Sequence, residues 1–165
     1  MKTLIQQLMD EHQIILSFLD GLEDELVAFM EEDIFIKDTY MNALSFIRNT
    51  ADKAHHQREE QILFRHLLQQ GNPIAINIIQ QGMLVEHDYA RFYCKELEKS
   101  VQQYDKEHKA IDKLTILSNA KAYCELLRRH IDKEDRVVYP FALRTLSEET
   151  LFEMEKENMA YNQAL

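Results

Sequence analysis

Apolar residues recur every three or four positions along most of the chain, which is the spacing of amphipathic helices. The first such stretch covers residues 3–31. Its apolar stripe consists of Ile5, Leu8, Ile15, Leu19, Leu22, Leu26 and Phe29, with His12 on the same line. The second stretch covers residues 35–70 and is followed by Gly71, Asn72 and Pro73. A glycine followed by a proline is typical of one helix ending and the next beginning.

Two more long helices and a short one complete the pattern. The third helix is predicted over residues 74–106, the fourth begins near Ala110, and Pro140 is expected to kink or end it. A short fifth helix follows Ser147. Long amphipathic helices joined by short loops favour antiparallel neighbours. The sequence therefore predicts an all-α, up-down-up-down four-helix bundle with a short C-terminal fifth helix, as a single domain over residues 1–165.

Composition narrows the class of protein. Three Gly and two Pro in 165 residues are too few for an architecture of strands and turns. A net charge of −10 without a Lys/Arg cluster argues against nucleic-acid and membrane partners. No apolar run reaches secretory or membrane-spanning length, so we expect a cytoplasmic protein. Cys94 and Cys124 are expected to be buried thiols, because two scattered cysteines form neither a disulfide framework nor a zinc motif.

Four of the seven histidines lie on the apolar stripes, one in each long predicted helix. They are His12, His55, His87 and His130. A single histidine on an apolar face is more often a hydrogen-bonded core residue than a ligand. Four of them on separate helices instead indicate a common site. The positions of His55 and His87 mirror each other across the turn at residues 71–73, which is compatible with one layer of an antiparallel bundle.

Carboxylates accompany two of these histidines. Glu59 and Glu134 follow His55 and His130 by four residues, so each pair lies on one side of a helix. The segments HHQREEQILF (residues 55–64) and HIDKEDRVVY (residues 130–139) share this pattern. Buried carboxylates are costly unless cations accompany them. Four imidazoles and two carboxylates suit iron or manganese better than zinc, and leave positions for an oxo or hydroxo bridge and an exogenous molecule.

These segments resemble the hemerythrin-like, or HHE cation-binding, family, whose four-helix bundle holds a di-iron centre. The resemblance covers nearly the whole chain and implies two iron ions as cofactor, with manganese or zinc less favoured. The residues that carry the resemblance lie in the segments DEHQ, HHQREEQILF, EHD and HIDKEDRVVYP. The metal ligands that the resemblance implies are His12, His55, Glu59, His87, His130 and Glu134. It assigns no catalytic residue.

Two choices of ligand remain open at this point. His56 with Glu60 is an alternative to His55 with Glu59. We prefer the latter, because His56 would point about 100° away around an α-helix. Asp135 is the alternative to Glu134, since oxygen-carrying hemerythrins use a histidine and an aspartate five residues apart.

The third helix bears on the subtype. Oxygen carriers offer two histidines one turn apart there, whereas Met83 and Arg91 flank His87 here. The set of four histidines and two glutamates is more similar to family members that repair iron-sulfur centres. We therefore expect a non-haem di-iron protein that binds, senses or reacts with oxygen, nitric oxide or peroxide, in stress defence or iron-sulfur repair. The alternative is an oxygen-binding, iron-storing or iron-sensing protein without catalytic turnover.

Other polar and aromatic residues fit ordinary structural roles. Solvent-facing histidines are expected at His66 and His108 and exposed carboxylates at Glu11 and Glu86. Tyr89, Tyr93 and Tyr123 are expected to be bundle residues whose hydroxyl groups reach water at the edge.

Overall fold

The computed structural model describes residues 2–165 of the chain as four long helices and a shorter C-terminal one. Several long helices contain π-helical segments, labelled η. The first helix is α1 (Leu4–Glu32), and the second joins α2 (Lys37–Phe46), η1 (Ile47–His56), η2 (Glu59–Phe64) and α3 (Arg65–Gln69). The third joins α4 (Pro73–Ile78), η3 (Ile79–Met83) and α5 (Leu84–Glu107). The fourth joins α6 (Ala110–Lys133), η4 (Glu134–Val138) and α7 (Tyr139–Thr145), and α8 spans Glu148–Ala164.

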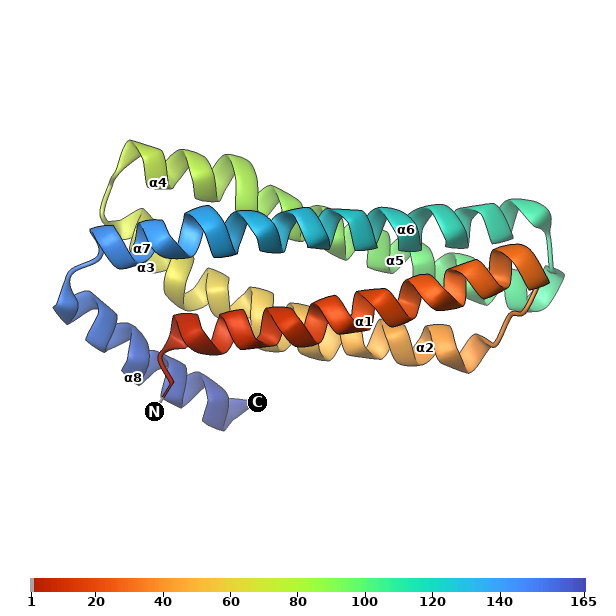
Figure 1. The fold of residues 1–165 in the computed structure, drawn as a ribbon, viewed down its shortest axis with the longest axis horizontal. Helices are drawn as coiled ribbons and strands as arrows, with labels where there is room; N and C mark the ends of the chain where they lie inside the picture. Colours follow the sequence, from red (N-terminus) through yellow and green to blue (C-terminus); the bar gives the residue numbers. More distant parts are fainter. Residues whose placement is uncertain (1) are drawn as a thin grey trace.

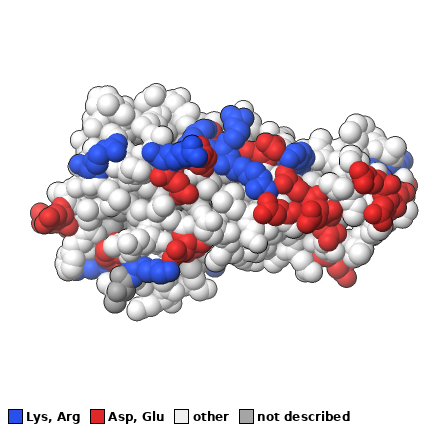
Figure 2. Space-filling model, in the orientation of Figure 1, with Lys and Arg blue, Asp and Glu red and all other residues white. Residues whose placement is uncertain are grey.

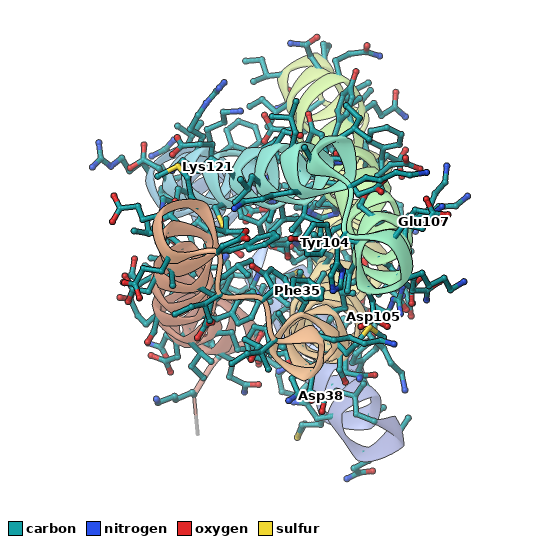
Figure 3. The ribbon with its side chains drawn as sticks, turned by 90° about the vertical axis from the view of Figure 1, so that its right-hand side faces the viewer. Phe35, Asp38, Tyr104, Asp105, Glu107 and Lys121 are labelled. Atoms are coloured by element: carbon teal, nitrogen blue, oxygen red, sulfur yellow. The ribbon has the colours of Figure 1, made fainter. Side chains whose placement is uncertain are left out.

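The four long helices run alternately up and down, and α8 crosses one end of the bundle (Figure 1). Helix α1 contacts α6 and η1, and α5 contacts α6 and α2. In the end-on view, α1 therefore lies diagonally across from α5, and the second helix lies across from the fourth (Figure 3). The predicted four-helix bundle with a C-terminal fifth helix is confirmed.

Local signals in the sequence fix the helix ends. Thr3 caps α1 by accepting a hydrogen bond from the Gln6 amide, in a capping box. Gly71 has a φ of 65° and ends the second helix, and Pro73 opens the third, as predicted. The fourth helix does not end at Pro140 but continues to Thr145. Pro140 lies in the first turn of α7, directly after the π turn η4, where a missing amide hydrogen costs little.

The π-helical segments change which side chains face the core. In η1, the amide of Gln57 donates to the carbonyl of Asp52, five residues earlier, instead of four. The amide of Tyr139 likewise donates to the carbonyl of Glu134 at the end of η4. A π turn holds more residues than an α turn, so consecutive side chains diverge by less than the 100° of an α-helix. Two neighbouring residues can then both face inward.

The core consists of two apolar clusters stacked along the bundle. At the end covered by α8, the cluster includes Leu4, Leu8, Leu63, Leu67, Ile79, Tyr139 and Met154. At the other end it includes Ile15, Leu19, Leu44, Leu97, Ile116 and Leu127. That end closes with aromatic rings, and Phe35 and Tyr104 lie between the helices with their centroids 4.8 Å apart (Figure 3). Cys94 and Cys124 are buried free thiols, as predicted.

Helix α8 is fastened to the start of α1. The backbone amide of Leu4 donates to both carboxylate oxygens of Glu155, with nitrogen-to-oxygen distances of 2.9 and 3.0 Å. Negative charge at a helix N-terminus is favourable, because the amides there have no partner within the helix. This contact orders the end of the bundle.

The outer surface is charged and laced with ion pairs. Figure 2 shows Lys and Arg atoms along the middle of one face, and Asp and Glu atoms gathered toward the end away from α8. On α6, Lys121 and Arg128 both pair with Glu23 of α1, at 2.6 and 2.7 Å. Within residues 2–165, no helix combines the length and the apolar character that a bilayer crossing needs.

Candidate metal centre

A layer of polar side chains separates the two apolar clusters. On α1, His12 lies between Leu8 of one cluster and Ile15 of the other, and on the third helix His87 lies between Met83 and Ala90. All six residues that the sequence predicted as ligands are in this layer. None has more than 2% of its surface exposed: His12, His55, Glu59, His87, His130 and Glu134.

The outer nitrogen of each of these four histidines is held by a carboxylate. The Nδ1 atoms donate to carboxylate oxygens in four pairs: His12 to Asp135 (2.8 Å), His55 to Glu11 (2.9 Å), His87 to Glu60 (2.7 Å) and His130 to Glu86 (2.9 Å). A hydrogen bond of this kind fixes the ring orientation and leaves Nε2 as the inward-facing nitrogen. We call the four acceptors, Glu11, Glu60, Glu86 and Asp135, the outer carboxylates.

The inner nitrogens surround two central carboxylates. His12 Nε2 lies 3.3 Å from Glu134 Oε2, and His130 Nε2 lies 3.2 Å from Glu134 Oε1. His55 Nε2 and His87 Nε2 lie 3.7 and 3.6 Å from Glu59 Oε2. The Nε2 atoms of His87 and His130 are themselves 3.0 Å apart. Four imidazole nitrogens and two carboxylates thus share one small buried volume.

These side chains form two overlapping groups in which all potential ligand atoms lie within 4.8 Å of one another. The first cation cluster consists of His12, His55, Glu59 and Glu134. The second cation cluster consists of His87, His130, Glu59 and Glu134. Because both glutamates belong to both clusters, the geometry suits two neighbouring cations with shared carboxylates.

Several inner atoms have no hydrogen-bond partner among residues 2–165. They are Glu59 Oε2, both carboxylate oxygens of Glu134, and His55 Nε2. A buried polar atom without a partner costs about 1–3 kcal/mol, and more when it is charged. Cations between the histidines and glutamates would satisfy these atoms together. The residues therefore fit a pair of metal ions.

The pKa values describe how the layer is charged without metal. Burial and the nearby charge of Glu134 raise the pKa of Glu59 well above its usual value. Burial opposes ionisation of Glu134 as well, but the charges of His130 and His12 prevail and lower its pKa. Burial would lower the pKa of His12 and His130, yet their carboxylate partners raise it to about 9 and about 10. Protons thus occupy places that cations would take.

The preference for His55 with Glu59 agrees with the first cation cluster, but the direction expected for the His56 side chain was wrong. We expected His56 to point away from the layer, but it is 2% exposed and its ring stacks on that of His87, with centroids 4.0 Å apart. A ring nitrogen of His56 lies within 4.8 Å of those of His87 and His130. The π winding of η1 explains this, because it lets His55 and His56 both face inward. Glu60, its suggested companion, is instead an outer carboxylate.

For two of the outer carboxylates, the expectation from the sequence was wrong. Glu11 and Glu86 were expected to be exposed, but each accepts a hydrogen bond from a histidine on another helix. Each also pairs with a cation, Arg58 for Glu11 and Lys133 for Glu86. Asp135, the alternative to Glu134, belongs to the same outer group. Sequence spacing does not reveal such contacts, because the partners come from different helices.

Two other expectations about isolated side chains were wrong. His66 is buried, and its Nε2 lies 3.3 Å from a carboxylate oxygen of Glu157 on α8, outside both clusters. Tyr123 is also buried, and its hydroxyl has no partner within the described residues. The exposed positions predicted for His108 and Tyr89 are confirmed.

Tyr139 is a polar neighbour of the site that the sequence interpretation missed. Its hydroxyl donates to Glu59 Oε1 at 2.6 Å and lies 3.2 Å from His12 Nε2. It occupies the last position of the segment at residues 130–139, where the matching segment ends in Phe64. That difference between two otherwise similar segments was the available signal.

Comparison with known families agrees with this geometry. The model of the hemerythrin HHE cation-binding domain matches residues 3–142. The chain therefore belongs to that family. No curated protein and no solved structure matches the chain. Family membership and the two buried clusters together support metal binding.

Proposed function

We propose that this protein binds two iron ions, one in each cation cluster, with Glu59 and Glu134 shared between them. The supporting observation is the orientation of the four histidines. Each Nδ1 donates to an outer carboxylate, and each Nε2 faces the two buried glutamates. Imidazole and carboxylate donors without a thiolate suit iron better than a structural zinc ion.

Iron ions bound here would supply redox chemistry and open coordination positions for a small molecule. The chain's own residues supply the rest. The outer carboxylates hold the imidazoles in place, and the apolar clusters on both sides keep bulk water out of the layer. The hydroxyl of Tyr139 offers a hydrogen bond at the inner face of the first cluster, between Glu59 and His12.

From this arrangement we propose a protein that binds, senses or reacts with small oxidants such as oxygen, nitric oxide or peroxide. A buried layer between apolar clusters admits small molecules more readily than large polar substrates. We assign the activity to stress defence or iron-sulfur repair, because the histidines and glutamates at the predicted positions resemble that part of the family. Turnover of peroxide or nitric oxide would support a reactive role, and reversible binding without turnover a carrying or sensing role.

The test is metal quantification on protein purified without oxygen, followed by an optical spectrum after exposure to oxygen. We expect two irons per chain and a ligand-to-iron charge-transfer band. His66→Gln is a suitable control, because it removes a buried imidazole outside both clusters and should leave the iron content unchanged. A colourless protein holding less than one iron per chain would refute the proposal.

A further inference from the structure

The two cation clusters are related by an internal repeat. Glu11 and His12 on α1 correspond to Glu86 and His87 on the third helix, and residues 55–64 correspond to residues 130–139. The outer contacts repeat accordingly. His55, Glu11 and Arg58 form one chain of contacts, and His130, Glu86 and Lys133 form its counterpart. The His12–Asp135 pair likewise corresponds to the His87–Glu60 pair.

Two positions that face this layer break the repeat. Ile131 occupies the place that corresponds to His56, and Phe64 the place that corresponds to Tyr139. Both members of the first pair are buried. One half of the layer therefore carries an imidazole where the other half carries an alkyl side chain.

His56 differs from the other four histidines of the layer because nothing in residues 2–165 hydrogen-bonds to either of its ring nitrogens. The nearest carboxylate oxygen, on Asp52, is 3.9 Å from Nδ1, which is too far for a hydrogen bond. Its ring stacks on His87, and its centroid lies 5.6 Å from that of His130. An imidazole that is almost fully buried and unpaired is costly, unless it has a partner that these side chains do not provide.

We propose that His56 is a fifth imidazole ligand, belonging to the second cation. This inference rests on the proposed pair of metal ions. The second cation then has three imidazoles from three helices (His56, His87 and His130) in addition to the two shared carboxylates. The first cation has two imidazoles and the same carboxylates. The two ions would therefore have different ligand sets, and the Tyr139 hydroxyl, 3.2 Å from His12 Nε2, lies beside the one with fewer imidazoles.

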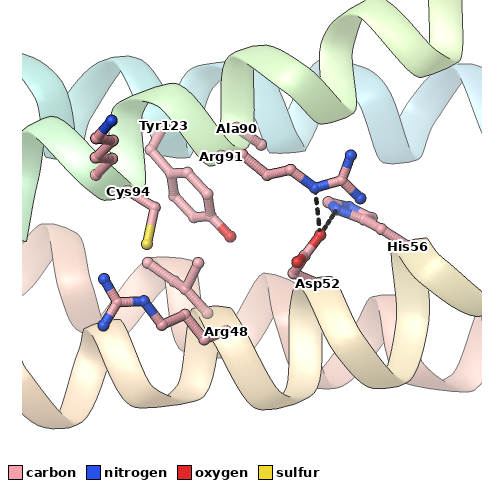
Figure 4. Close-up of a pocket in the computed structure, with 9 residues that line it drawn as sticks. Arg48, Asp52, His56, Ala90, Arg91, Cys94 and Tyr123 are labelled. Atoms are coloured by element: carbon pink, nitrogen blue, oxygen red, sulfur yellow. Dashed lines mark hydrogen bonds and ion pairs between the residues drawn. The ribbon is translucent and has the colours of Figure 1, made fainter.

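A cavity on the far side of His56 makes this assignment testable. Its volume is about 300 Å³, and Arg48, Asp52, Arg91, Cys94 and Tyr123 line it together with His56. Figure 4 shows the His56 ring at one end of this space, near Asp52 and Arg91. The space is large enough to admit free imidazole to the place of a deleted His56 side chain.

The experiment compares iron binding and Mössbauer spectra of the wild type, His56→Gly and His56→Ile. The His56→Ile variant introduces the residue found at the corresponding position of the repeat, Ile131. An isoleucine is buried there, so this side chain suits the position of His56. We expect two distinct iron environments in the wild type. Both variants should bind the second iron at least about tenfold more weakly and keep the first. Added imidazole should restore the second iron in His56→Gly, but not in His56→Ile, where the side chain fills the place.

The possible failures are distinguishable. If both variants retain two irons with unchanged affinity and unchanged Mössbauer parameters, His56 is not a ligand, although the proposed iron pair stands. If the wild type binds no iron, both proposals fail. His66→Gly serves as the control for imidazole addition, because it removes a buried histidine from outside the clusters and should leave both irons unaffected. A folding failure of His56→Gly leaves His56→Ile to decide the question.

Discussion

The polar layer has two halves, one around the first cation cluster and one around the second. Their contacts correspond, but the cations that pair with their outer carboxylates differ in exposure. In the first half, Arg58 holds the outer carboxylate Glu11 and also donates to Asn162 of α8, and its side chain is 2% exposed. In the second half, Lys133 holds Glu86 with a side chain that is 41% exposed. The cation of this outer contact is thus buried on one side, where it also contacts α8, and open to water on the other. The outer carboxylates orient the histidines in both halves, whereas the exposure of the cation behind each carboxylate differs between the halves.

The largest effect is expected from a substitution of a shared glutamate, because it changes both halves at once. Glu134→Gln removes the charge that both clusters use and leaves His12 and His130 without their inner carboxylate partner. We expect the affinity for both irons to fall by at least about 100-fold, because each half keeps only one inner carboxylate, Glu59, to balance the charge of its cation. Iron titration measured by calorimetry checks this. Glu153→Gln on the exposed face of α8 is the matched control and should bind two irons.

The halves should respond alike to pH. Without metal, His12 in the first half and His130 in the second have pKa values of about 9 and about 10, so both are protonated at neutral pH. Each must lose a proton to become a ligand, so iron binding weakens as the pH falls. Between pH 6 and 8, the two histidine protons alone predict a fall of about 100-fold per pH unit for the pair of ions, and any proton held by Glu59 makes the fall steeper. Calorimetry in buffers of different ionisation enthalpy would count the protons released, and a pH-independent affinity would contradict this account.

The sequence predicted the helices and the polar layer because both depend on local periodicity. Apolar spacing located all four long helices, and His-x-x-x-Glu spacing located Glu59 and Glu134. It missed His56 because the prediction assumed α-helical winding, and the π turn of η1 rotates that side chain inward. A π turn depends on how the whole layer packs, and residue spacing alone does not reveal it.

The outer carboxylates were missed for a different reason. Glu11 directly precedes His12 in the chain, and neighbouring side chains diverge by about 100° on an α-helix, so local spacing indicates that the two point apart. Its actual partner, His55, lies 44 positions along the chain on another helix. Such pairings depend on the register between helices, which single-helix periodicity does not give.

The outer carboxylates offer a sharper comparison of the halves. Glu11→Gln and Glu86→Gln should each weaken iron binding by about 10–100-fold, because each removes the charge that orients a ligand histidine. Glu11→Gln should also cost about 1–3 kcal/mol of folding stability, because it leaves the buried Arg58 without its charged partner. Glu86→Gln should cost less than about 1 kcal/mol, since Lys133 reaches water.

Chemical denaturation of the metal-free variants measures this difference. Glu98→Gln, which removes the carboxylate of a surface ion pair with Arg48, is the control and should leave iron binding unchanged. Equal losses of stability in Glu11→Gln and Glu86→Gln would show that the cover provided by α8 does not distinguish the halves.

Tyr139 and Phe64 provide the mildest test. Tyr139→Phe makes the first half resemble the second at this position and removes the donor to Glu59 Oε1. We expect two irons to remain bound, with affinity reduced only a few-fold, because no proposed ligand is lost. A spectroscopic titration with azide should show weaker binding of this exogenous anion, since the hydroxyl lies 3.2 Å from His12 Nε2 in the first cation cluster and can donate to a bound anion there. An unchanged azide affinity would show that the Tyr139 hydroxyl does not contribute to binding of the exogenous anion.

The central claim is that two metal ions occupy the buried layer between the apolar clusters. Crystals of the protein loaded with iron, measured on both sides of the iron absorption edge, test it directly. We predict two anomalous peaks, one next to His12 and His55 and the other next to His87 and His130, with Glu59 and Glu134 between them. A map with no peak in this layer, or with a single one, would contradict it.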